Sequence, residues 1–366
     1  MLSKSTISDI SELDRLKATW NSLASADPRA RLCNSFSWVE SWIQYYWVPD
    51  YILLVVVIKA GDRPVALLPL YFNTYHNKVM FLGAGEPEQS EVASEYLDFL
   101  IDAGSLDQGI IYSFIIDHHN SLSRSTFEFT NCLDSSHVVH IAKSLTAVHY
   151  RVTGKRFQID LGKRFEEISK NFSKNHRKKS REIFNRFNNS KDLEFHSLPD
   201  ENFERNWEIL RSLHTQDWLS RGKLGAFSDT AFNQFHKHMY DNHPDVKQFF
   251  FSLTRGGKTI SINHYYQFKD TVYFYATGSD KANNKSLSPG ILLHNLCIAS
   301  LSGQQLVYDF MKGAINGSYK QKFCKSSGCF YTITIYSQDF PGKIRYFVHK
   351  IKRALLNFKQ QSGTVK

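Results

Sequence analysis

The stretch that decides the fold is residues 271–313, TVYFYATGSDKANNKSLSPGILLHNLCIASLSGQQLVYDFMKG. Apolar and aromatic residues predict a strand over 271–278, and the uninterrupted apolar run after Pro289 predicts a helix over 290–302 that ends at Gly303. A further strand is expected at 306–310. Two more strands, 247–254 and 258–268, precede this stretch and are joined by turn sequences typical of hairpins. The order predicts a mixed α/β unit with a mostly antiparallel sheet.

The loop between strand 271–278 and helix 290–302 has few bulky side chains. Ser288 is a suitable helix cap and Pro289 fits the first helical turn. Exposed backbone N–H groups and the positive end of a helix dipole attract anions, so the loop predicts a phosphate-binding site. Ordinary helix capping explains the same residues, and the sequence leaves both interpretations open.

The length of 366 residues corresponds to two domains of ordinary size. In the first half, patterns predict helices near 10–23, 36–47 and 106–116, and strands at 51–59, 64–72, 78–83, 126–130 and 137–141. In the second half they predict a basic helix over 164–188 and helices over 200–219 and 229–241 before the strands already described. We therefore expect domains at residues 1–155 and 156–340, followed by an amphipathic helix at 341–366.

The net charge of +10 is concentrated in two segments. Residues 163–191 and 341–366 are both rich in Lys and Arg, and the remainder of the chain is slightly acidic. Basic segments suit a phosphate-bearing ligand, RNA or an anionic membrane surface, although a solvated helix face has the same composition. In 341–366 the apolar residues share one helical face, which either docks on the protein or lies on a membrane.

Other sequence features exclude several classes of protein. The first thirty residues contain no apolar core of a signal peptide, and no apolar run is long enough for a transmembrane helix. Five cysteines, an odd number, fit reduced thiols better than a disulfide framework. His236, His238 and His243 with Asp241 have loose spacing interrupted by Pro244, so a polar helix end is favoured and no metal site is predicted.

An ordered set of short motifs resembles a known family. It consists of NFSKNHRKK at 171–179, Leu213-His214 with Trp218 and Gly222, YATG at 275–278, SPG at 288–290, YDFMKG at 308–313 and Tyr319-Lys320. Residues 160–323 thereby resemble the GNAT-like acetyltransferases of bacterial cellulose and exopolysaccharide biosynthesis, the CelD/BcsL type. In the first half, FSWVESW at 36–42 and YLDF at 96–99 look like landmarks of the same family.

The resemblance implies two GNAT-like units, with the acyl-CoA site in the second. It implies cofactor contacts from Tyr275, Ala276, Thr277, Gly278, Ser288, Pro289, Gly290 and Lys320, and acceptor contacts from Arg177, His214 and Trp218. The usual glycine-rich pyrophosphate pattern is absent between Gly278 and Gly290. The architecture is also similar to that of aminoacyl-transferases that use aminoacyl-tRNA to build peptidoglycan cross-bridges.

Acyl transfer to an amine requires a neutral nucleophile, oxyanion stabilisation and a proton for the leaving thiolate. In a GNAT fold these meet where two parallel strands part, here 271–278 and 306–310, with a backbone N–H near Tyr275 or Ala276 facing the oxyanion. Asp309 and His264 are the candidate bases and Tyr319 the candidate acid. Each has a structural alternative: Asp309 as a turn cap, His264 as a core histidine and Tyr319 as a packed side chain.

The resemblance implies an acyltransferase that uses acetyl-CoA or another acyl-CoA, and no metal is expected. The expected acceptor is an amine or hydroxyl of an amino sugar or polysaccharide precursor, in cell-envelope or exopolysaccharide synthesis. We expect a cytoplasmic protein with a possible peripheral contact to the membrane or to a polysaccharide synthase through 341–366, and nucleic acid is not an expected partner. The alternatives are transfer from aminoacyl-tRNA and a non-enzymatic scaffold at the membrane.

Overall fold

The computed structural model describes residues 1–104, 108–121, 125–198, 202–220, 222–337, 339, 341–348 and 350–351. We call residues 1–160 the N-terminal half and residues 161–337 the C-terminal half. Among the described residues, none of the helices combines the length and the apolar character that crossing a bilayer requires. The part of segment 341–366 that the structure describes is helical over 341–348, and its Ile344, Phe347 and Val348 are exposed.

Each half contains an antiparallel meander, a helix and a further strand, as the apolar patterns predict. The elements of the N-terminal half are β1 (Leu2–Ile7), α1 (Lys17–Ala26), α2 (Phe36–Tyr46), β2 (Tyr51–Ala60), β3 (Arg63–Asn73), β4 (Lys78–Phe81), β5 (Leu100–Ile101), α3 (Gln108–Ser121), β6 (Thr126–Leu133), α4 (His137–Lys143) and β7 (Val148–Asp160).

The C-terminal half repeats this order with additional helices before its meander. Its elements are α5 (Phe165–Ile168), α6 (Lys174–Asn189), β8 (Leu193–Leu198), α7 (Phe203–Leu219), α8 (Thr230–Asn242), β9 (Lys247–Arg255), β10 (Lys258–Phe268), β11 (Thr271–Ser279), α9 (Pro289–Leu301), β12 (Val307–Gly313) and β13 (Ser326–Ile335). A short 3-10 helix at Tyr319–Lys322 lies between β12 and β13.

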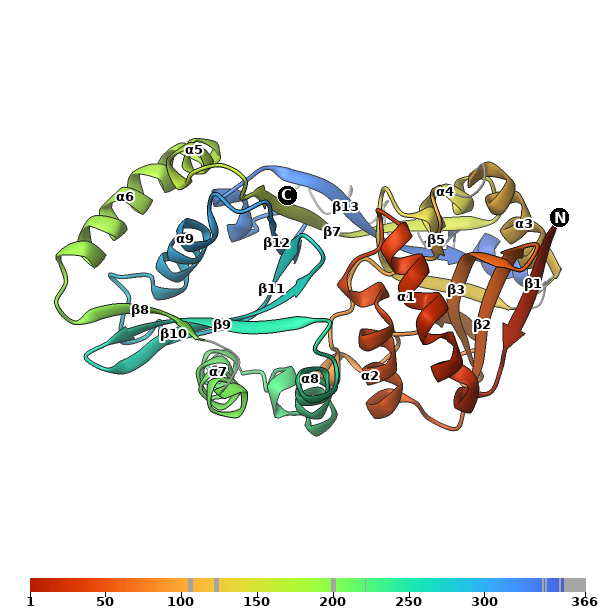
Figure 1. The fold of residues 1–366 in the computed structure, drawn as a ribbon, viewed down its shortest axis with the longest axis horizontal. Helices are drawn as coiled ribbons and strands as arrows, with labels where there is room; N and C mark the ends of the chain where they lie inside the picture. The colour runs from red at the N-terminus through yellow and green to blue at the C-terminus, as the bar shows by residue number, and fades with distance from the viewer. Residues whose placement is uncertain are drawn as a thin grey trace.

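One continuous sheet joins the two halves (Figure 1). Its strand order is β1-β2-β3-β4-β6-β13-β7-β12-β11-β10-β9-β8, with β5 paired to β3. In each half the last meander strand pairs in parallel with the strand after the helix, β4 with β6 and β11 with β12. The fold is therefore α/β with a mostly antiparallel sheet and flanking helices, as the sequence predicts.

The halves exchange their last strands. β7 ends the N-terminal half but pairs with β12, whereas β13 ends the C-terminal half and pairs with β6. β7 and β13 also pair with each other, so they close the seam at the centre of the sheet. The expected boundary between residues 155 and 156 lies inside β7. The division into domains at 1–155, 156–340 and 341–366 stays a prediction.

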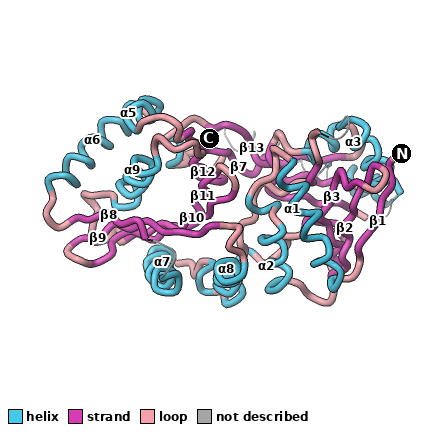
Figure 2. The backbone as a smooth tube through the Cα atoms, viewed as in Figure 1, coloured by secondary structure: helices cyan, strands magenta, loops and turns pink. Residues whose placement is uncertain are grey.

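Helices cover both faces of the C-terminal part of the sheet (Figure 2). α6 and α9 lie on one face, where α9 contributes Leu292, Leu293 and Ile298 to one hydrophobic core. α7 and α8 lie on the other face and share a second core with the N-terminal half. Trp38 of α2 packs edge-on against Phe235 of α8, with ring centroids 4.8 Å apart. Helix α8 therefore connects the two halves.

Two local expectations are wrong. The segment 137–141 was expected to be a strand, but it lies in helix α4, because the Ser136 side chain accepts a hydrogen bond from Val139 N and caps the helix. The basic helix expected over 164–188 is divided into α5 and α6. Ser173 caps α6 by accepting from His176 N, so a new helix begins there.

Candidate active site

The two strands expected to form the site are parallel neighbours whose pairing is short. β11 pairs with β12 through Thr271–Val307, Val272–Tyr308 and Tyr273–Asp309, and the pairing ends there. On its other edge β12 continues to pair with β7 as far as Gly313. The two strands therefore part after Tyr273 and Asp309, which leaves a break in the ladder at their carboxyl-terminal ends.

A β-bulge lies in β11 beside this break. In the pairing of β10 with β11, Tyr265 is opposite Phe274 and His264 is opposite Ala276, so Tyr275 is the additional residue. A bulged residue is left out of the regular ladder. The backbone around Tyr275 and Ala276, where the sequence predicts the oxyanion donor, is therefore irregular.

A cavity of about 1120 Å³ lies at the carboxyl-terminal end of β11. Phe274 and Tyr275 both line it, although Phe274 packs on His294 of α9 and Tyr275 packs on His236 of α8, on opposite faces of the sheet. Because its wall includes residues from both faces of the sheet, the cavity extends from one face to the other beside β11, at the point where β11 and β12 part. A donor on one face and an acceptor on the other can meet in such a space.

The cavity brings together six of the predicted site residues, namely His214, Trp218, Tyr275, Ala276, Thr277 and Tyr319. His214 and Trp218 stack on α7, with ring centroids 5.6 Å apart. The N-terminal half adds Glu88, Gln89, Glu91 and Ala93 to the wall. Both halves of the chain therefore build the cavity.

Among the residues that the structure describes, the wall of the cavity carries more acid than base. Glu88, Glu91, Asp217 and Asp229 line it together with Lys223 and Lys281. Lys281 Nζ pairs with Asp217 Oδ2 at 2.9 Å, and Asp229 caps α8 by accepting from Phe232 N. Glu88 and Glu91 are exposed. The surplus of carboxylates favours a cationic group, such as an amine, in the cavity.

Tyr319 is the outer end of a chain of buried hydrogen bonds. Its hydroxyl lies 3.2 Å from His294 Nε2, and His294 Nδ1 lies 2.8 Å from Tyr308 OH. Tyr308 OH lies 2.9 Å from Tyr265 OH, which accepts a hydrogen bond from Asn263 Nδ2 at 3.0 Å. One assignment of protons gives every contact in this chain a donor and an acceptor. Tyr265 donates to Tyr308, Tyr308 donates to His294, and His294 donates to Tyr319, so the hydroxyl proton of Tyr319 points into the cavity.

Burial sets the protonation states along this chain. It lowers the pKa of His294 to about 3, so the imidazole is neutral and has one N–H and one acceptor nitrogen. Burial also raises the pKa of the Tyr319 hydroxyl, which keeps its proton at neutral pH. Tyr319 is therefore a protonated donor at the cavity wall, as its expected role as an acid requires.

Asp309 lies outside the cavity wall and is fully buried, with 0% exposure. Its carboxylate accepts hydrogen bonds from Tyr96 OH at 2.9 and 2.8 Å, from Gln158 Nε2 at 2.8 Å and from Met311 N at 2.7 Å. Arg156 Nε is 3.5 Å from the same group. These donors occupy the lone pairs that a general base needs, so the surroundings favour a structural role at the seam of the sheet.

His264 also lies away from the cavity. It is fully buried between α7 and α8, and its Nε2 is 3.0 Å from Gln248 Oε1. Burial lowers its pKa to about 3. A base is most effective when its pKa is near the working pH, so the interpretation of His264 as a core histidine fits this environment better.

Lys320 is buried beneath the strand end rather than exposed to a ligand. Its Nζ donates hydrogen bonds to the carbonyl oxygens of Phe310 and Lys312, the latter at 2.7 Å. Burial lowers the pKa of its ammonium, although the nearby carboxyl of Glu95 raises it. The ammonium thus binds the carboxyl-terminal end of β12 where that strand leaves β11.

The remaining predicted residues are outside the cavity wall. Gly278 lets α7 approach β11, since a Cβ there would lie 2.7 Å from Leu213 Cβ and 3.0 Å from the Leu210 carbonyl oxygen. Ser288 and Pro289 begin α9, but the Ser288 side chain makes no capping hydrogen bond and instead contacts Lys179 Nζ at 3.0 Å. Gly290 follows on α9, where a Cβ would lie 3.0 Å from Ser279 Oγ. Arg177 lies on α6 and donates to the Lys170 carbonyl.

Sequence reasoning missed several residues at the site. Glu88 and Glu91 belong to no motif in the sequence, and the position of their loop beside Tyr275 depends on the packing of the halves, where Tyr275 OH donates to the Val92 carbonyl at 2.8 Å. His294 falls inside an apolar helix with no pattern that marks it. Glu95 is buried, accepts from Lys312 N at 2.6 Å and has its pKa raised to about 7 by that burial.

A comparison with protein families finds a match in the second half of the chain. Residues 170–321 match the family model described as acetyltransferase (GNAT) domain. The C-terminal half is therefore similar to GNAT acetyltransferase domains, and this similarity supports an acyltransferase. The matched range agrees with the range of the resemblance, 160–323. No curated protein sequence matches the chain.

Solved structures share the fold of the whole chain. FemX has a TM-score of 0.56 at 8% identity, covering 90% of this chain and 96% of FemX. The C-terminal domain of a putative lysylphosphatidylglycerol synthetase from Agrobacterium fabrum has a TM-score of 0.51 at 11% identity, covering 92% and 95%. At these identities the likeness shows the fold, and the substrates have to be argued from the site itself.

Proposed function

We propose that this chain transfers an acyl group from an acyl-CoA to the amine of a small acceptor, in the cavity at the end of β11. The observation that carries the proposal is the position of this cavity, which includes residues of both faces of the sheet where β11 and β12 part. A thioester can thus enter on one face and an amine on the other. The acceptor we propose is an amino sugar or polysaccharide precursor of cell-envelope or exopolysaccharide synthesis, as in the CelD/BcsL type.

Two features support a CoA donor. The basic side chains of Lys179 and Arg186 contact the loop that leads into α9, through Ser288 Oγ and the Ser286 carbonyl, both at 3.0 Å. The amino-terminal end of α9 adds the positive end of a helix dipole. Phosphates of a CoA bound along this loop would meet positive charge while its thioester extends to Ala276.

The acceptor side supports an amine. Glu88 and Glu91 attract a cation, and His214 is the imidazole in the cavity wall. In the proposed reaction His214 takes the proton from the amine nitrogen as that nitrogen attacks the carbonyl carbon. The new C–N bond forms and the C–S bond breaks. The backbone N–H at Tyr275 or Ala276 donates to the oxyanion, and Tyr319 gives its proton to the departing sulfur.

The test is release of CoA from acetyl-CoA in the presence of a panel of amines and matched alcohols, including glucosamine and glucose. We expect amine-dependent release with the wild type, and a loss of at least about 10²-fold in kcat for His214→Gln with acetyl-CoA binding retained. Lys143→Gln, which changes an exposed residue on α4, is the control. The proposal is wrong if the wild type binds acetyl-CoA but transfers to no amine, or if His214→Gln has full activity.

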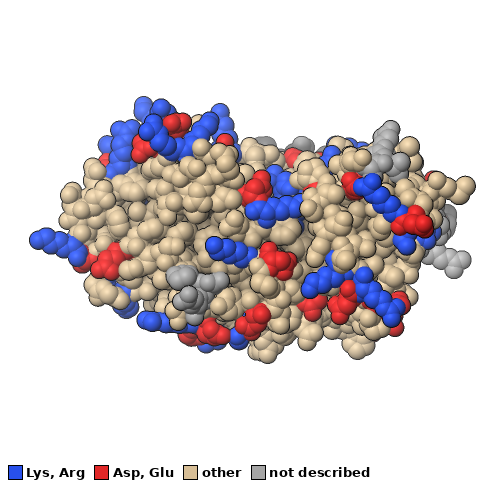
Figure 3. Space-filling view, in the orientation of Figure 1, with Lys and Arg blue, Asp and Glu red and all other residues tan. Residues whose placement is uncertain are grey.

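A second candidate is transfer from aminoacyl-tRNA. One observation favours it: exposed basic residues gather over α5 and α6 (Figure 3). Such a surface would bind RNA with an affinity that falls steeply with salt. Retention of tRNA at physiological salt, with loss on neutralising Lys174, Lys178 and Arg181, would support this candidate. The absence of RNA binding under those conditions would exclude it.

A further inference from the structure

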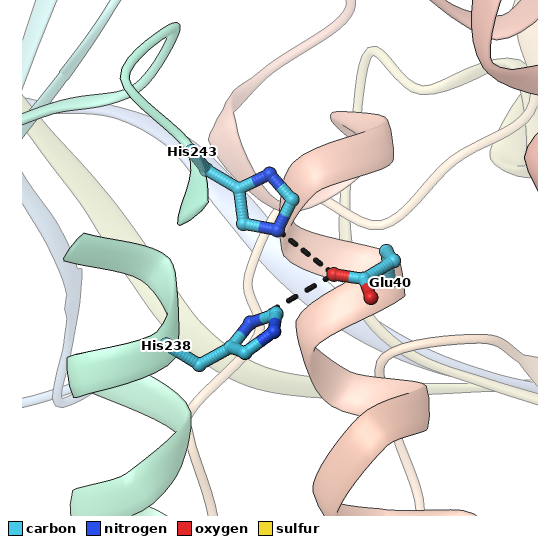
Figure 4. Close-up of side chains that lie close together, drawn as sticks. All are labelled: Glu40, His238 and His243. Atoms are coloured by element: carbon cyan, nitrogen blue, oxygen red, sulfur yellow. Dashed lines mark hydrogen bonds and ion pairs between the residues drawn. The ribbon is translucent and has the colours of Figure 1, made fainter. Parts of the chain in front are cut away.

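Two histidines and a glutamate meet where the halves are joined by helices. Glu40 lies on α2 in the N-terminal half, His238 lies on α8, and His243 is the residue that ends α8. One ligand atom from each of the three lies within 4.8 Å of the others. Figure 4 shows that both imidazole rings point towards the carboxylate of Glu40, which lies on the facing helix α2.

The distances among these atoms suit a metal complex. His243 Nε2 is 2.8 Å from Glu40 Oε2, and His238 Nδ1 is 3.8 Å from the same oxygen. Zinc binds imidazole nitrogen and carboxylate oxygen at about 2.0–2.2 Å, which in a tetrahedron separates the ligand atoms by about 3.3–3.5 Å. To admit an ion, the contact from His243 to Glu40 would lengthen and that from His238 would shorten, by about half an ångström each. The two imidazole nitrogens, which lie within 4.8 Å of each other, would also move to this spacing.

The ligand chemistry also selects the kind of ion. Two imidazoles and a carboxylate suit Zn²⁺ or a similar transition metal, whereas Mg²⁺ and Ca²⁺ prefer oxygen ligands. Two nearby acids have partners of their own, because Asp241 pairs with Lys237 Nζ at 2.8 Å and Asp245 accepts from Ser37 Oγ at 2.7 Å.

The cluster is held in place by its surroundings. His243 is 5% exposed and His238 packs on the Tyr45 ring, with centroids 5.6 Å apart. The Ser41 hydroxyl is 3.0 Å from His238 Nδ1, which fixes the ring at the edge of the cluster. An ion at this position would exchange that contact for a bond to the nitrogen and keep one coordination site for water.

Sequence reasoning grouped His236, His238, His243 and Asp241 and favoured a polar helix end. In the structure His236 points into the core, with Nδ1 2.5 Å from Tyr266 OH, and Asp241 pairs with Lys237. The residue that completes the cluster, Glu40, is about two hundred positions away in the sequence. Spacing alone therefore could not reveal this combination.

We propose that Glu40, His238 and His243 form a binding site for a divalent transition-metal ion of the Zn²⁺ type. The ion would join α2 to α8 and so fix the N-terminal half against the C-terminal half. This matters for the cavity at the end of β11, because its walls come from both halves. The role is structural and independent of the chemistry proposed for that cavity.

The test uses full-length protein without a histidine tag, treated with a chelator and then titrated with ZnCl₂ by calorimetry. We expect saturable binding of one ion and a rise in the unfolding temperature that saturates with zinc. Co²⁺ should give the visible absorption of a low-symmetry nitrogen and oxygen complex. Glu40→Gln should weaken binding at least about tenfold, because changes even beyond the direct ligands cost that much.

The double variant His238→Ala/His243→Ala should lose the binding, whereas His76→Ala, which removes an exposed histidine elsewhere, should retain it. Circular dichroism shows whether each variant is folded. If the double variant does not fold, Glu40→Gln still tests the site, because this substitution preserves the volume and the polarity of the side chain. Absence of saturable zinc binding by the folded wild type would overturn the proposal. Unchanged binding by Glu40→Gln would overturn it as well.

Discussion

The hydroxyl of Tyr319 lies 3.2 Å from Nε2 of His294, which connects a residue in the cavity wall to a buried chain of hydrogen bonds. His294 is neutral because burial lowers its pKa to about 3. A neutral imidazole that donates to Tyr319 stabilises the tyrosinate formed when Tyr319 gives up its proton. The arrangement therefore supports Tyr319 as the acid for the leaving thiolate.

Tyr319→Phe should lower kcat by about 10²-fold or more and leave the affinity for acetyl-CoA nearly unchanged, because the ring remains and only the proton donor is lost. Single-turnover kinetics separates the chemical step from binding. Tyr331→Phe, a partly buried tyrosine on β13 outside the cavity wall, is the matched control. Wild-type kcat in Tyr319→Phe would remove Tyr319 from the chemistry.

His264→Gln should change stability with pH but have little effect on activity. The folded pKa of about 3 is below the unfolded value of about 6.5. As the pH falls, His264 is therefore protonated in the unfolded state before it is protonated in the folded state. The free energy of unfolding of the wild type then falls relative to that of the variant, by up to about 1.4 kcal/mol per pH unit. Denaturant titrations at pH 7, 6 and 5 measure this difference. A constant difference across these pH values would contradict a buried, neutral His264.

Lys320→Met should destabilise the protein, since it leaves the carbonyl oxygens of Phe310 and Lys312 without their buried donor. A cost of about 1–3 kcal/mol is expected for each unsatisfied buried group. Lys322→Met, on the same short helix but exposed, should cost less than about 0.5 kcal/mol. Equal unfolding free energies for the two variants would show that Lys320 does not bind the end of β12.

Much of the fold follows from local patterns. The meanders, the apolar helix α9 and the parallel pair β11 and β12 are visible as apolar periodicity and turn residues. Strands β7 and β13 are harder to predict, because their polarity reflects a position in the seam between halves and because their partners lie far away in sequence. α4 was mistaken for a strand, since a seven-residue helix shows too little periodicity.

The sequence predicts the site residues well where they lie close to the end of β11. It predicts them poorly where burial determines whether a side chain can reach the cavity. His214, Trp218, Tyr275, Ala276, Thr277 and Tyr319 line one cavity. Asp309, His264 and Lys320 are typical catalytic residue types, but the sequence does not show that Tyr96, Gln248 and the backbone of β12 occupy their polar atoms. The Tyr96 contact depends on packing between the halves, and the other two depend on packing within the C-terminal half.

Gly278→Ala should be destabilising by about 1–3 kcal/mol, because the new methyl group would press against Leu213 and the backbone of α7. The displaced helix carries His214, so activity should fall with stability. Gly104→Ala is the control, since a Cβ there meets only the Asp102 carboxylate at an ordinary 3.5 Å. Unfolding free energies of both variants check the difference. A stable and active Gly278→Ala protein would contradict the close approach of α7 to β11.

The central claim is that an acyl-CoA binds where β11 and β12 part. Isothermal titration of acetyl-CoA into the wild type and into Ala276→Leu tests it most directly, because the larger side chain fills the cavity beside the bulge. Ala18→Leu, on the exposed face of α1, controls for added bulk. The account predicts saturable binding by the wild type and Ala18→Leu and at least about tenfold weaker binding by Ala276→Leu, a cost of about 1.4 kcal/mol. No binding by the folded wild type, or equal binding by all three proteins, would contradict it.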